Sequence, residues 1–189
     1  MATATQITTG RVRFSYVNAF TARAAQEGAQ PKYSVTLLIP KTDKNTIAKI
    51  KAAIEAAKTA YLQKHSGKKL PSALKTTLHD GDGERPNGGE FGEECKGCYV
   101  ITVSSNNKPV LVHADKTPLT DPQELYSGCY GRAIINFYVY DTQGNKGISA
   151  GLNGIMKLYD GEPLGGGVVT DSDWDDGWED EDDNDDLLG

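Results

Sequence analysis

The stretch CYGRAIINFYVYD, from Cys129 to Asp141, decides the fold because apolar and polar side chains alternate along it. Its odd-numbered positions 133–139 hold alanine, isoleucine, phenylalanine and valine, which predict the buried face of a β-strand. The turn TQGNKG leads into ISAGLNGIMKLYD (148–160), a second apolar stretch that its glycines allow to bend. The C-terminal part of the domain is therefore expected to be a pair of strands joined by a turn.

Shorter alternating stretches predict strands elsewhere in the chain. Val12, Phe14 and Tyr16 are expected on the inner face of a first strand, and KYSVTLLIP (32–40) predicts a second. The Ala-rich stretch 21–30 between them is expected to be a loop. CYVITVSSN and NKPVLVHAD, together residues 98–115, predict two further strands joined as a hairpin by the turn NNKP. Three aromatic residues of these strands are expected in the core: Phe14, Tyr33 and Phe137.

One amphipathic helix is expected before Gly67. Apolar residues recur there at spacings of three and four, the period of an α-helix: Ile47, Ile50, Ile54, Ala57 and Tyr61. Thr42 or Asp43 can cap its N-terminus, and Gly67 suits a left-handed C-terminal position. Its lysines lie mostly off the apolar stripe and are expected to form a solvated face.

The stretch 67–97 is rich in Gly, Asp, Glu and Lys, and predicts a long loop with one short element near 74–78. Five or six strands at short spacing, with one helix inserted after the second, predict a mainly β fold: a small closed or partly open barrel. A parallel α/β fold is excluded because a single helix cannot supply its crossovers.

Charge divides the chain into two parts. The segment 171–189 holds 11 of the 26 acidic residues and none of the 20 basic ones, so residues 1–170 carry a net charge of +5. A mildly basic domain (1–167) followed by a disordered acidic tail (168–189) is therefore expected. Such asymmetry is typical of a polyanion-binding domain or an interaction tail.

The sequence carries no recognisable catalytic motif. Its three histidines lack metal-ligand spacing, and there is no nucleophile elbow or phosphate-binding glycine loop. CKGC (95–98) has the spacing of half a zinc site, and DGDGE (80–84) resembles the start of a calcium loop, but Phe91 stands where that loop needs glutamate. We therefore expect reduced thiols beside a turn, a polar turn, no metal and no cofactor.

Location follows from what the chain lacks. No secretory leader and no apolar run of 18 residues is apparent, so no membrane span is expected. An odd number of cysteines without a leader predicts reduced thiols in the cytoplasm.

The outward face of the 129–141 strand points to nucleic acid. Guanidinium groups neutralise phosphates, and tyrosine rings offer flat surfaces on which unpaired bases stack. The alternative is that the tyrosines cover a second small core under the helix. The candidate phosphate contacts are Arg11, Arg13, Lys32, Lys108 and Arg132, and the candidate stacking residues are Tyr130, Tyr138 and Tyr140, with Phe20 as a further candidate.

The acidic tail contains apolar side chains that suit docking onto a basic, hydrophobic pocket of a partner. A polyanion tethered beside a basic groove would also compete with nucleic acid for that groove. The candidate partner-binding residues are Trp174, Trp178, Asp182, Asp183, Asp185, Asp186, Leu187 and Leu188.

Three blocks of sequence resemble a family of bacteriophage single-stranded DNA-binding proteins: PKYSVTLLIPK (31–41), KIKAAIEAAK (49–58) and the segment 126–166. The resemblance implies an OB-fold that binds single strands without marked sequence preference in phage DNA replication, recombination or repair. The tail is similar to those with which replication single-strand binders recruit polymerases and helicases, although many of those end in an aromatic residue and this one ends in Leu-Leu-Gly.

We therefore expect an OB-fold-like, noncatalytic single-stranded DNA-binding protein, in the bacterial host cytoplasm if it is phage-encoded. An exposed barrel edge could pair two copies into a homodimer. Two alternatives stay open: a protein-interaction scaffold without DNA binding, and a metal-dependent nuclease that uses the carboxylates of 80–84.

Overall fold

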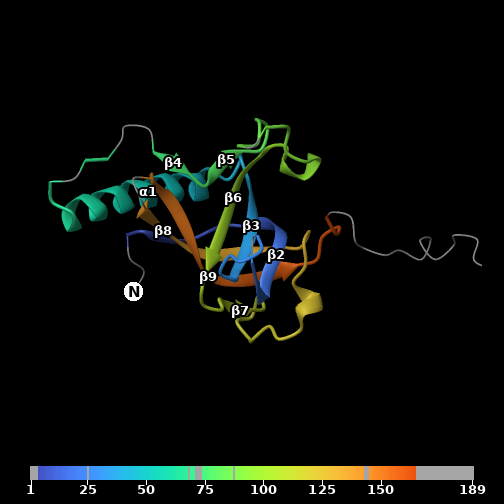
Figure 1. Ribbon diagram of the computed structural model, residues 1–189. Helices are drawn as coiled ribbons and strands as arrows, with labels where there is room; N and C mark the ends of the chain where they lie inside the picture. Colours follow the sequence, from blue (N-terminus) through green and yellow to red (C-terminus); the bar gives the residue numbers. More distant parts are fainter. Residues whose placement is uncertain are drawn as a thin grey trace, which may run out of the picture.

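Five strands close into a ring in the computed structural model of the protein (Figure 1). The structure describes residues 4–24, 26–67, 69–70, 74–86, 88–142 and 145–164. Within these ranges the chain forms nine strands, one α-helix and two short 3-10 helices. In chain order they are β1 (Gln6–Thr8), β2 (Val12–Arg23), β3 (Lys32–Pro40), α1 (Lys44–Lys64), β4 (Lys75–Thr76), β5 (Leu78–Asp80), η1 (Glu93–Cys95), β6 (Cys98–Ser105), β7 (Val110–Val112), η2 (Pro122–Glu124), β8 (Tyr130–Thr142) and β9 (Asn145–Tyr159).

The ring runs β2–β3–β6–β9–β8 and returns to β2. Neighbours pair antiparallel except β6 and β9, which run parallel and meet in one residue pair, Ser104 with Gly151. A five-stranded barrel of this kind is the OB type, so the predicted mainly β barrel with one inserted helix is confirmed. The strand count exceeds the five or six predicted, because β1, β4 and β5 have only two or three residues and show no alternation in sequence.

The barrel interior is filled by the inward side chains of the long strands. Phe14 and Phe137 are fully buried there, as predicted, together with branched aliphatic residues such as Leu37 and Ile135. Tyr33 is only partly buried. The long pair β8–β9, predicted from its alternation and turn, is confirmed from Tyr130 to Tyr159.

Helix α1 lies between β3 and β6 in the chain and packs against β8 and β1 (Figure 1). Its N-terminus is capped by Asp43, whose carboxylate accepts from the backbone N–H of Thr46 at 3.2 Å. Ile50, Ala57 and Tyr61 of the predicted apolar stripe are buried. The predicted helix, its cap and its buried face are therefore confirmed.

Two sequence predictions about the connections between strands are wrong. The stretch 21–30 is not all loop, because β2 pairs with β3 as far as Arg23 opposite Lys32. The stretch 98–115 is not a hairpin, because β7 pairs in parallel with β9 rather than with β6. The turn after β6 therefore leads to β7 beside β9 instead of back along β6.

Among the described residues, no helix is long and apolar enough to cross a membrane. Residues 165–189 lie outside the described ranges. The predicted tail (168–189), its candidate residues and the domain boundary at 167 therefore stay predictions.

Candidate nucleic-acid interface

The alternation of β2 breaks after Phe14. Ser15 is buried, whereas Tyr16 is 65% exposed. The pairing of β2 with β3 shifts register between Ser15 and Asn18, as it does at a β-bulge. Because an inserted residue turns the following side chains to the opposite face, the prediction that Tyr16 shares the inner face with Phe14 is wrong.

Tyr16 also has an unusual backbone. Its φ of 47° lies in the left-handed region, which costs a residue other than glycine about 1–2 kcal/mol. Residues held in such conformations cluster at ligand-binding and active sites. The strain here holds an aromatic ring out into solvent, which favours a role in binding over a role in packing.

A groove runs over the outer surface of β2, β3 and β6, with Tyr16 at its centre. It consists of three adjoining hollows of about 350, 390 and 610 Å³. Tyr16 lines the two smaller hollows, and Asn18 and Arg23 are shared between the two larger ones. The floor consists of short hydroxyl side chains from the three strands: Ser15, Ser34, Thr36, Thr102 and Ser104. Such a floor lets a flat ligand approach the sheet closely.

Cationic side chains stand at both ends of this groove. Arg23 and Lys32 are exposed and line the largest hollow. At the opposite end, the guanidinium carbon of Arg85 lies 5.7 Å from the centroid of the Phe91 ring, and both residues line the smallest hollow. The groove therefore combines an aromatic centre, a polar floor and positive ends.

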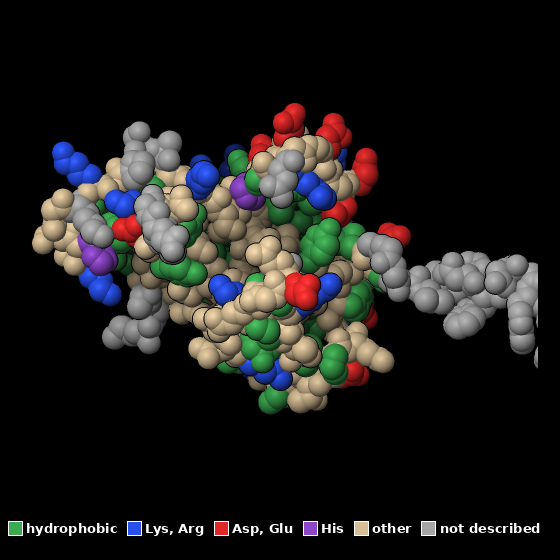
Figure 2. Space-filling view, viewed as in Figure 1, with side chains coloured by type: hydrophobic (Ala, Val, Ile, Leu, Met, Phe, Trp, Pro, Cys, Tyr) green, Lys and Arg blue, Asp and Glu red, His purple; other side chains and the backbone are tan. Residues whose placement is uncertain are grey.

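The connection between β5 and β6 forms one wall of the groove. Figure 2 shows that Asp and Glu side chains gather over this connection. One of its carboxylates, that of Glu94, lines the two smaller hollows and is partly buried. A negative charge there opposes the binding of an anionic ligand, so it lowers the affinity that the cationic ends provide.

Three of the predicted contact residues come together with Tyr159 in an arginine–tyrosine cluster: Arg11, Arg13, Tyr130 and Tyr159. The two tyrosine rings stack with centroids 5.1 Å apart. The guanidinium carbon of Arg13 lies 5.4 Å from the Tyr130 centroid, and that of Arg11 lies 6.0 Å from the Tyr159 centroid. Arg11 also donates to the Tyr159 hydroxyl at 2.7 Å. Each of the two stacked rings is thus in contact with one arginine, Tyr130 with Arg13 and Tyr159 with Arg11.

The arginine–tyrosine cluster adjoins the middle hollow of the groove. Arg13 donates to the carbonyl oxygens of Gly128 and Glu162. The neighbouring Ser127 and Leu164 line the hollow of about 390 Å³, and the Leu164 N–H donates to the Ser127 carbonyl at 2.9 Å. The cluster and the groove therefore form one continuous surface.

The other predicted residues lie elsewhere, except Lys32 in the groove. Arg132 donates through Nε to the carbonyl of Thr9 at 2.9 Å. Tyr138 is 42% exposed on the outward face of β8, and the Tyr140 ring packs over Gly147. Eight residues of strand, about 26 Å, separate Tyr138 from Tyr130. The nitrogen of Lys108 lies 5.5 Å from the Phe20 ring centroid. The eight candidates therefore do not line a single trough.

The acidic stretch 80–84 makes its contacts with a lysine. Lys41 lies 2.6 Å from a carboxylate oxygen of Asp80 and 2.7 Å from one of Asp82. Its hydrogen bonds lower the pKa of both carboxyls and raise the pKa of the lysine. Such pairing holds the two carboxylates in an ion-pair network, so a ligand cation would have to displace the lysine.

The cysteines are free thiols in the structure. Cys95 and Cys98 belong to one small apolar cluster with Leu38 and Val100, and burial raises the pKa of both thiols. Within the described ranges, no group of three or more His, Cys, Asp or Glu side chains is placed to hold a metal ion.

Sequence reasoning missed Tyr16, Arg23, Arg85 and Tyr159. The alternation that starts at Val12 predicts an inward Tyr16, and the sequence gives no sign of the bulge that ends this alternation after Ser15. Arg23 and Arg85 lie in stretches that were expected to be loops and that carry no periodic pattern. Tyr159 lies at the end of a predicted strand, and pairing of that strand with the 129–141 strand places it opposite Tyr130, which is the signal that could have found it.

Two solved structures of a bacteriophage protein are similar to this chain. The single-stranded DNA-binding protein from bacteriophage Enc34, in complex with ssDNA, is 29% identical, with a TM-score of 0.73 over 86% of this chain and 90% of that one. The same protein in another structure is 30% identical, with a TM-score of 0.70 over 92% and 91% of the two chains.

Two further proteins are also similar to this chain. Putative protein p50 of Acyrthosiphon pisum secondary endosymbiont phage 1 is 29% identical over 90% of this chain and 93% of its own length. The single-stranded DNA-binding protein gp2.5 of bacteriophage T7 is 15% identical, with a TM-score of 0.59 over 93% and 96% of the chains, and shares the fold. Residues 5–188 match the family described as Enterobacter phage Enc34, ssDNA-binding protein, and the chain belongs to that family.

Proposed function

We propose that the protein binds single-stranded DNA in the groove of β2, β3 and β6, with little preference for sequence. The observation that carries this proposal is the exposed ring of Tyr16, held by a left-handed backbone at the centre of a groove with cationic ends. The family, with a relative solved in complex with ssDNA, supports the same ligand.

Each part of the groove has a chemical task. Tyr16 stacks on an unpaired base, an interaction worth about 1–3 kcal/mol that every base can make. Arg23, Lys32 and Arg85 neutralise phosphates at the two ends. The hydroxyl floor donates and accepts hydrogen bonds without a fixed pattern. The lack of fixed donors and acceptors accounts for the low sequence preference that we propose.

The arginine–tyrosine cluster extends the path of the strand beyond the groove. Tyr159 is 42% exposed and offers a second ring, flanked by Arg11. We place a further nucleotide over this cluster, which keeps Arg11, Arg13 and Tyr130 among the DNA contacts. Arg132, Lys108, Tyr138 and Tyr140 would contact only a strand that continues around the barrel.

The acidic tail competes with DNA for the same groove in this proposal. Leu164, the last described residue, lines the hollow of about 390 Å³. The acidic segment starts at Asp171, seven residues further on, a reach of about 23 Å at most. A short tether gives the carboxylates a high effective concentration at the cationic ends of the groove.

The biological role follows from ligand and tail together. The protein protects single strands during phage DNA replication, recombination or repair, and it acts without catalysis. Its tail recruits replication proteins such as a polymerase or helicase when DNA has displaced it from the groove.

Fluorescence anisotropy with a labelled oligonucleotide tests the proposal, with a duplex of equal length as the competitor. If about four phosphates are neutralised, the logarithm of affinity falls with the logarithm of salt concentration at a slope near −3, from about 0.7 per phosphate. Arg23→Ala should flatten that slope by about 0.7, whereas Lys51→Ala, exposed on α1, should leave it unchanged. Absence of binding would favour a protein-interaction scaffold, and magnesium-dependent loss of the oligonucleotide would reveal a nuclease.

A further inference from the structure

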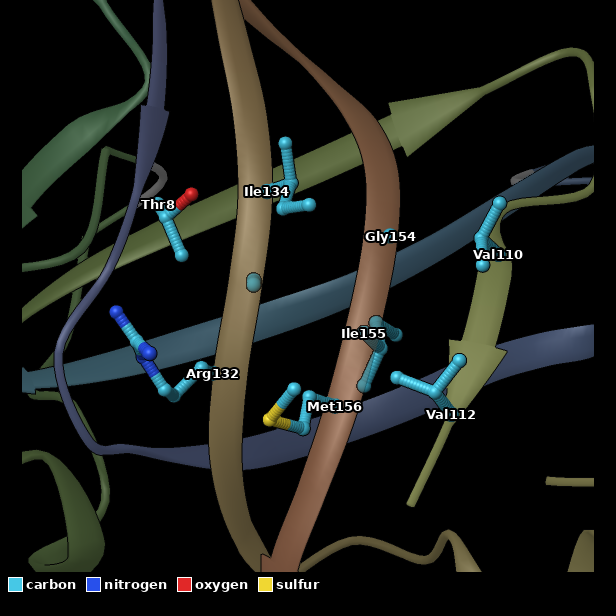
Figure 3. Close-up of a pocket in the computed structure, with 9 residues that line it drawn as sticks. Thr8, Val110, Val112, Arg132, Ile134, Gly154, Ile155 and Met156 are labelled. Carbon is cyan, nitrogen blue, oxygen red and sulfur yellow. The ribbon is translucent and has the colours of Figure 1, made fainter. Parts of the chain in front are cut away.

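An apolar pocket of about 90 Å³ lies on the outer wall of the barrel, across β1, β8, β9 and β7 (Figure 3). Figure 3 shows Thr8 and Arg132 on the β1 side, Val110 and Val112 on the β7 side, and Ile134 and Met156 between them. None of its lining residues lines the hollows of the groove. The pocket is therefore a second site, on a part of the barrel wall that the groove does not use.

The pocket exists because one position of β9 has no side chain. A Cβ added to Gly154 would lie 3.3 Å from the Val110 carbonyl oxygen and 3.7 Å from Ile134 Cδ1. Glycine there leaves a hollow between two apolar side chains that water reaches, since Val110 is 67% exposed and Ile134 is 38% exposed. Apolar side chains around a concave site, with one arginine at the edge, suit an apolar group that carries negative charge beside it.

We propose that this pocket binds the C-terminal end of the chain, with a leucine of Leu187–Leu188 in the hollow and the carboxylates of Asp185 and Asp186 beside Arg132. The chain has 25 residues after Leu164, enough to span about 80 Å when extended, so its end can reach any face of the barrel. Charge also matches, because the guanidinium of Arg132 donates through Nε to Thr9, and within the described ranges its terminal nitrogens make no hydrogen bond and can meet carboxylates.

The size of the pocket favours leucine over the other apolar groups of the tail. An apolar cavity of about 150 Å³ holds benzene, a six-carbon ring. A pocket of about 90 Å³ therefore suits the four-carbon side chain of leucine better than the indole of Trp174 or Trp178. A second barrel as occupant would need about 800 Å² of surface from each partner, far more than this pocket offers.

Docking of the chain end would hold the tail at two points. Leu164 fixes one end at the groove and Leu187 fixes the other on the barrel wall. The acidic stretch between them would then lie against the basic barrel instead of extending into solvent. The docking itself needs no DNA, so it can hold or fail independently of the proposed function.

Methionine labelling tests the docking directly. The chain has two methionines, Met1 and Met156, and Met156 lines the pocket. In full-length protein with ¹³C-labelled methionine methyl groups, the Met156 signal should differ between the natural chain and the double variant Leu187→Asp with Leu188→Asp. The double variant Trp174→Ala with Trp178→Ala is the matched control and should keep the natural position of the signal.

Addition of a peptide of residues 179–189 to the leucine variant should return the Met156 signal to its natural position, and a peptide with both leucines changed to aspartate should not. If the difference between the Met156 signals of the natural chain and the leucine variant grows with protein concentration, the C-terminal leucines still occupy the pocket, but those of a second copy of the chain. Identical Met156 signals in the natural chain and the leucine variant would overturn the proposal. A shift in the tryptophan variant alone would also overturn it, in favour of an indole as occupant.

Discussion

Replacement of Tyr16 by glycine should weaken DNA binding and leave the fold as stable as before, or more so. Loss of the ring removes a stacking interaction of about 1–3 kcal/mol, which is about a 5- to 150-fold weaker affinity. Loss of the side chain costs the fold little, because 65% of it is exposed.

The backbone sets the second half of this expectation. At φ 47° glycine relieves about 1–2 kcal/mol of strain, and the greater freedom of glycine stabilises the unfolded chain by about 1 kcal/mol. The net change in the free energy of unfolding lies between zero and about +1 kcal/mol, which raises Tm by at most about 2–4 °C in a domain of this size.

Anisotropy titrations and thermal unfolding measured on the same samples provide the assay. Tyr16→Ala keeps the strain and should lose both affinity and a little stability, whereas Tyr16→Phe keeps the ring and should bind as the natural protein does. Unchanged affinity in Tyr16→Gly would refute the assignment of Tyr16 as a stacking residue. A large loss of stability would show that the ring supports the fold.

Four further perturbations have defined outcomes. Glu94→Gln should tighten binding about two- to fivefold in low salt, because it removes a repulsion of about 0.5–1 kcal/mol, and a titration with labelled oligonucleotide measures it. Deletion of 171–189 should tighten binding about tenfold or more at low salt; equal affinity would mean that the tail stays out of the groove. Tyr138→Ala combined with Tyr140→Ala should weaken binding by less than Tyr16→Gly does, and the circular dichroism spectrum should stay unchanged. Loss of the folded spectrum would instead favour the alternative in which these tyrosines cover a second small core under the helix. Lys41→Met should reduce the loss of stability on acidification, because the lysine holds the pKa of the Asp80 and Asp82 carboxyls below its ordinary value. The ion pairs therefore stabilise the fold at a pH above the ordinary pKa, and this contribution vanishes as the pH falls through the lowered pKa. Urea unfolding midpoints measured between about pH 6 and about pH 3 would show the difference.

The long elements could be predicted because their patterns are unbroken. β8 and β9 alternate over many residues around a recognisable turn, and α1 repeats its apolar residues over about four turns with Asp43 before it. The pairing of β7 could not be predicted, because three residues carry no information on which neighbour they will meet. Its parallel contact with β9 depends on barrel closure, a tertiary event.

The site was predicted less completely than the fold, for a local reason. The alternation of odd and even positions predicts which face of a strand a side chain lies on. One bulge after Ser15 reverses this alternation for the rest of β2. Arg13 and Tyr130 come together because they pair directly across β2 and β8, in the unbroken first part of β2. Arg85 reaches the groove through the β5–β6 connection, and no period in the sequence indicates that approach.

The seam between β6 and β9 is the shortest pairing in the ring, because these strands meet in a single pair of residues. Ser104 belongs both to that seam and to the floor beneath the bound strand. Local opening of the barrel should therefore begin under the ligand, and amide hydrogens on either side should exchange fastest in the free protein. Bound DNA would then slow exchange on both sides of this seam, including at Gly151 of β9, which does not line the groove.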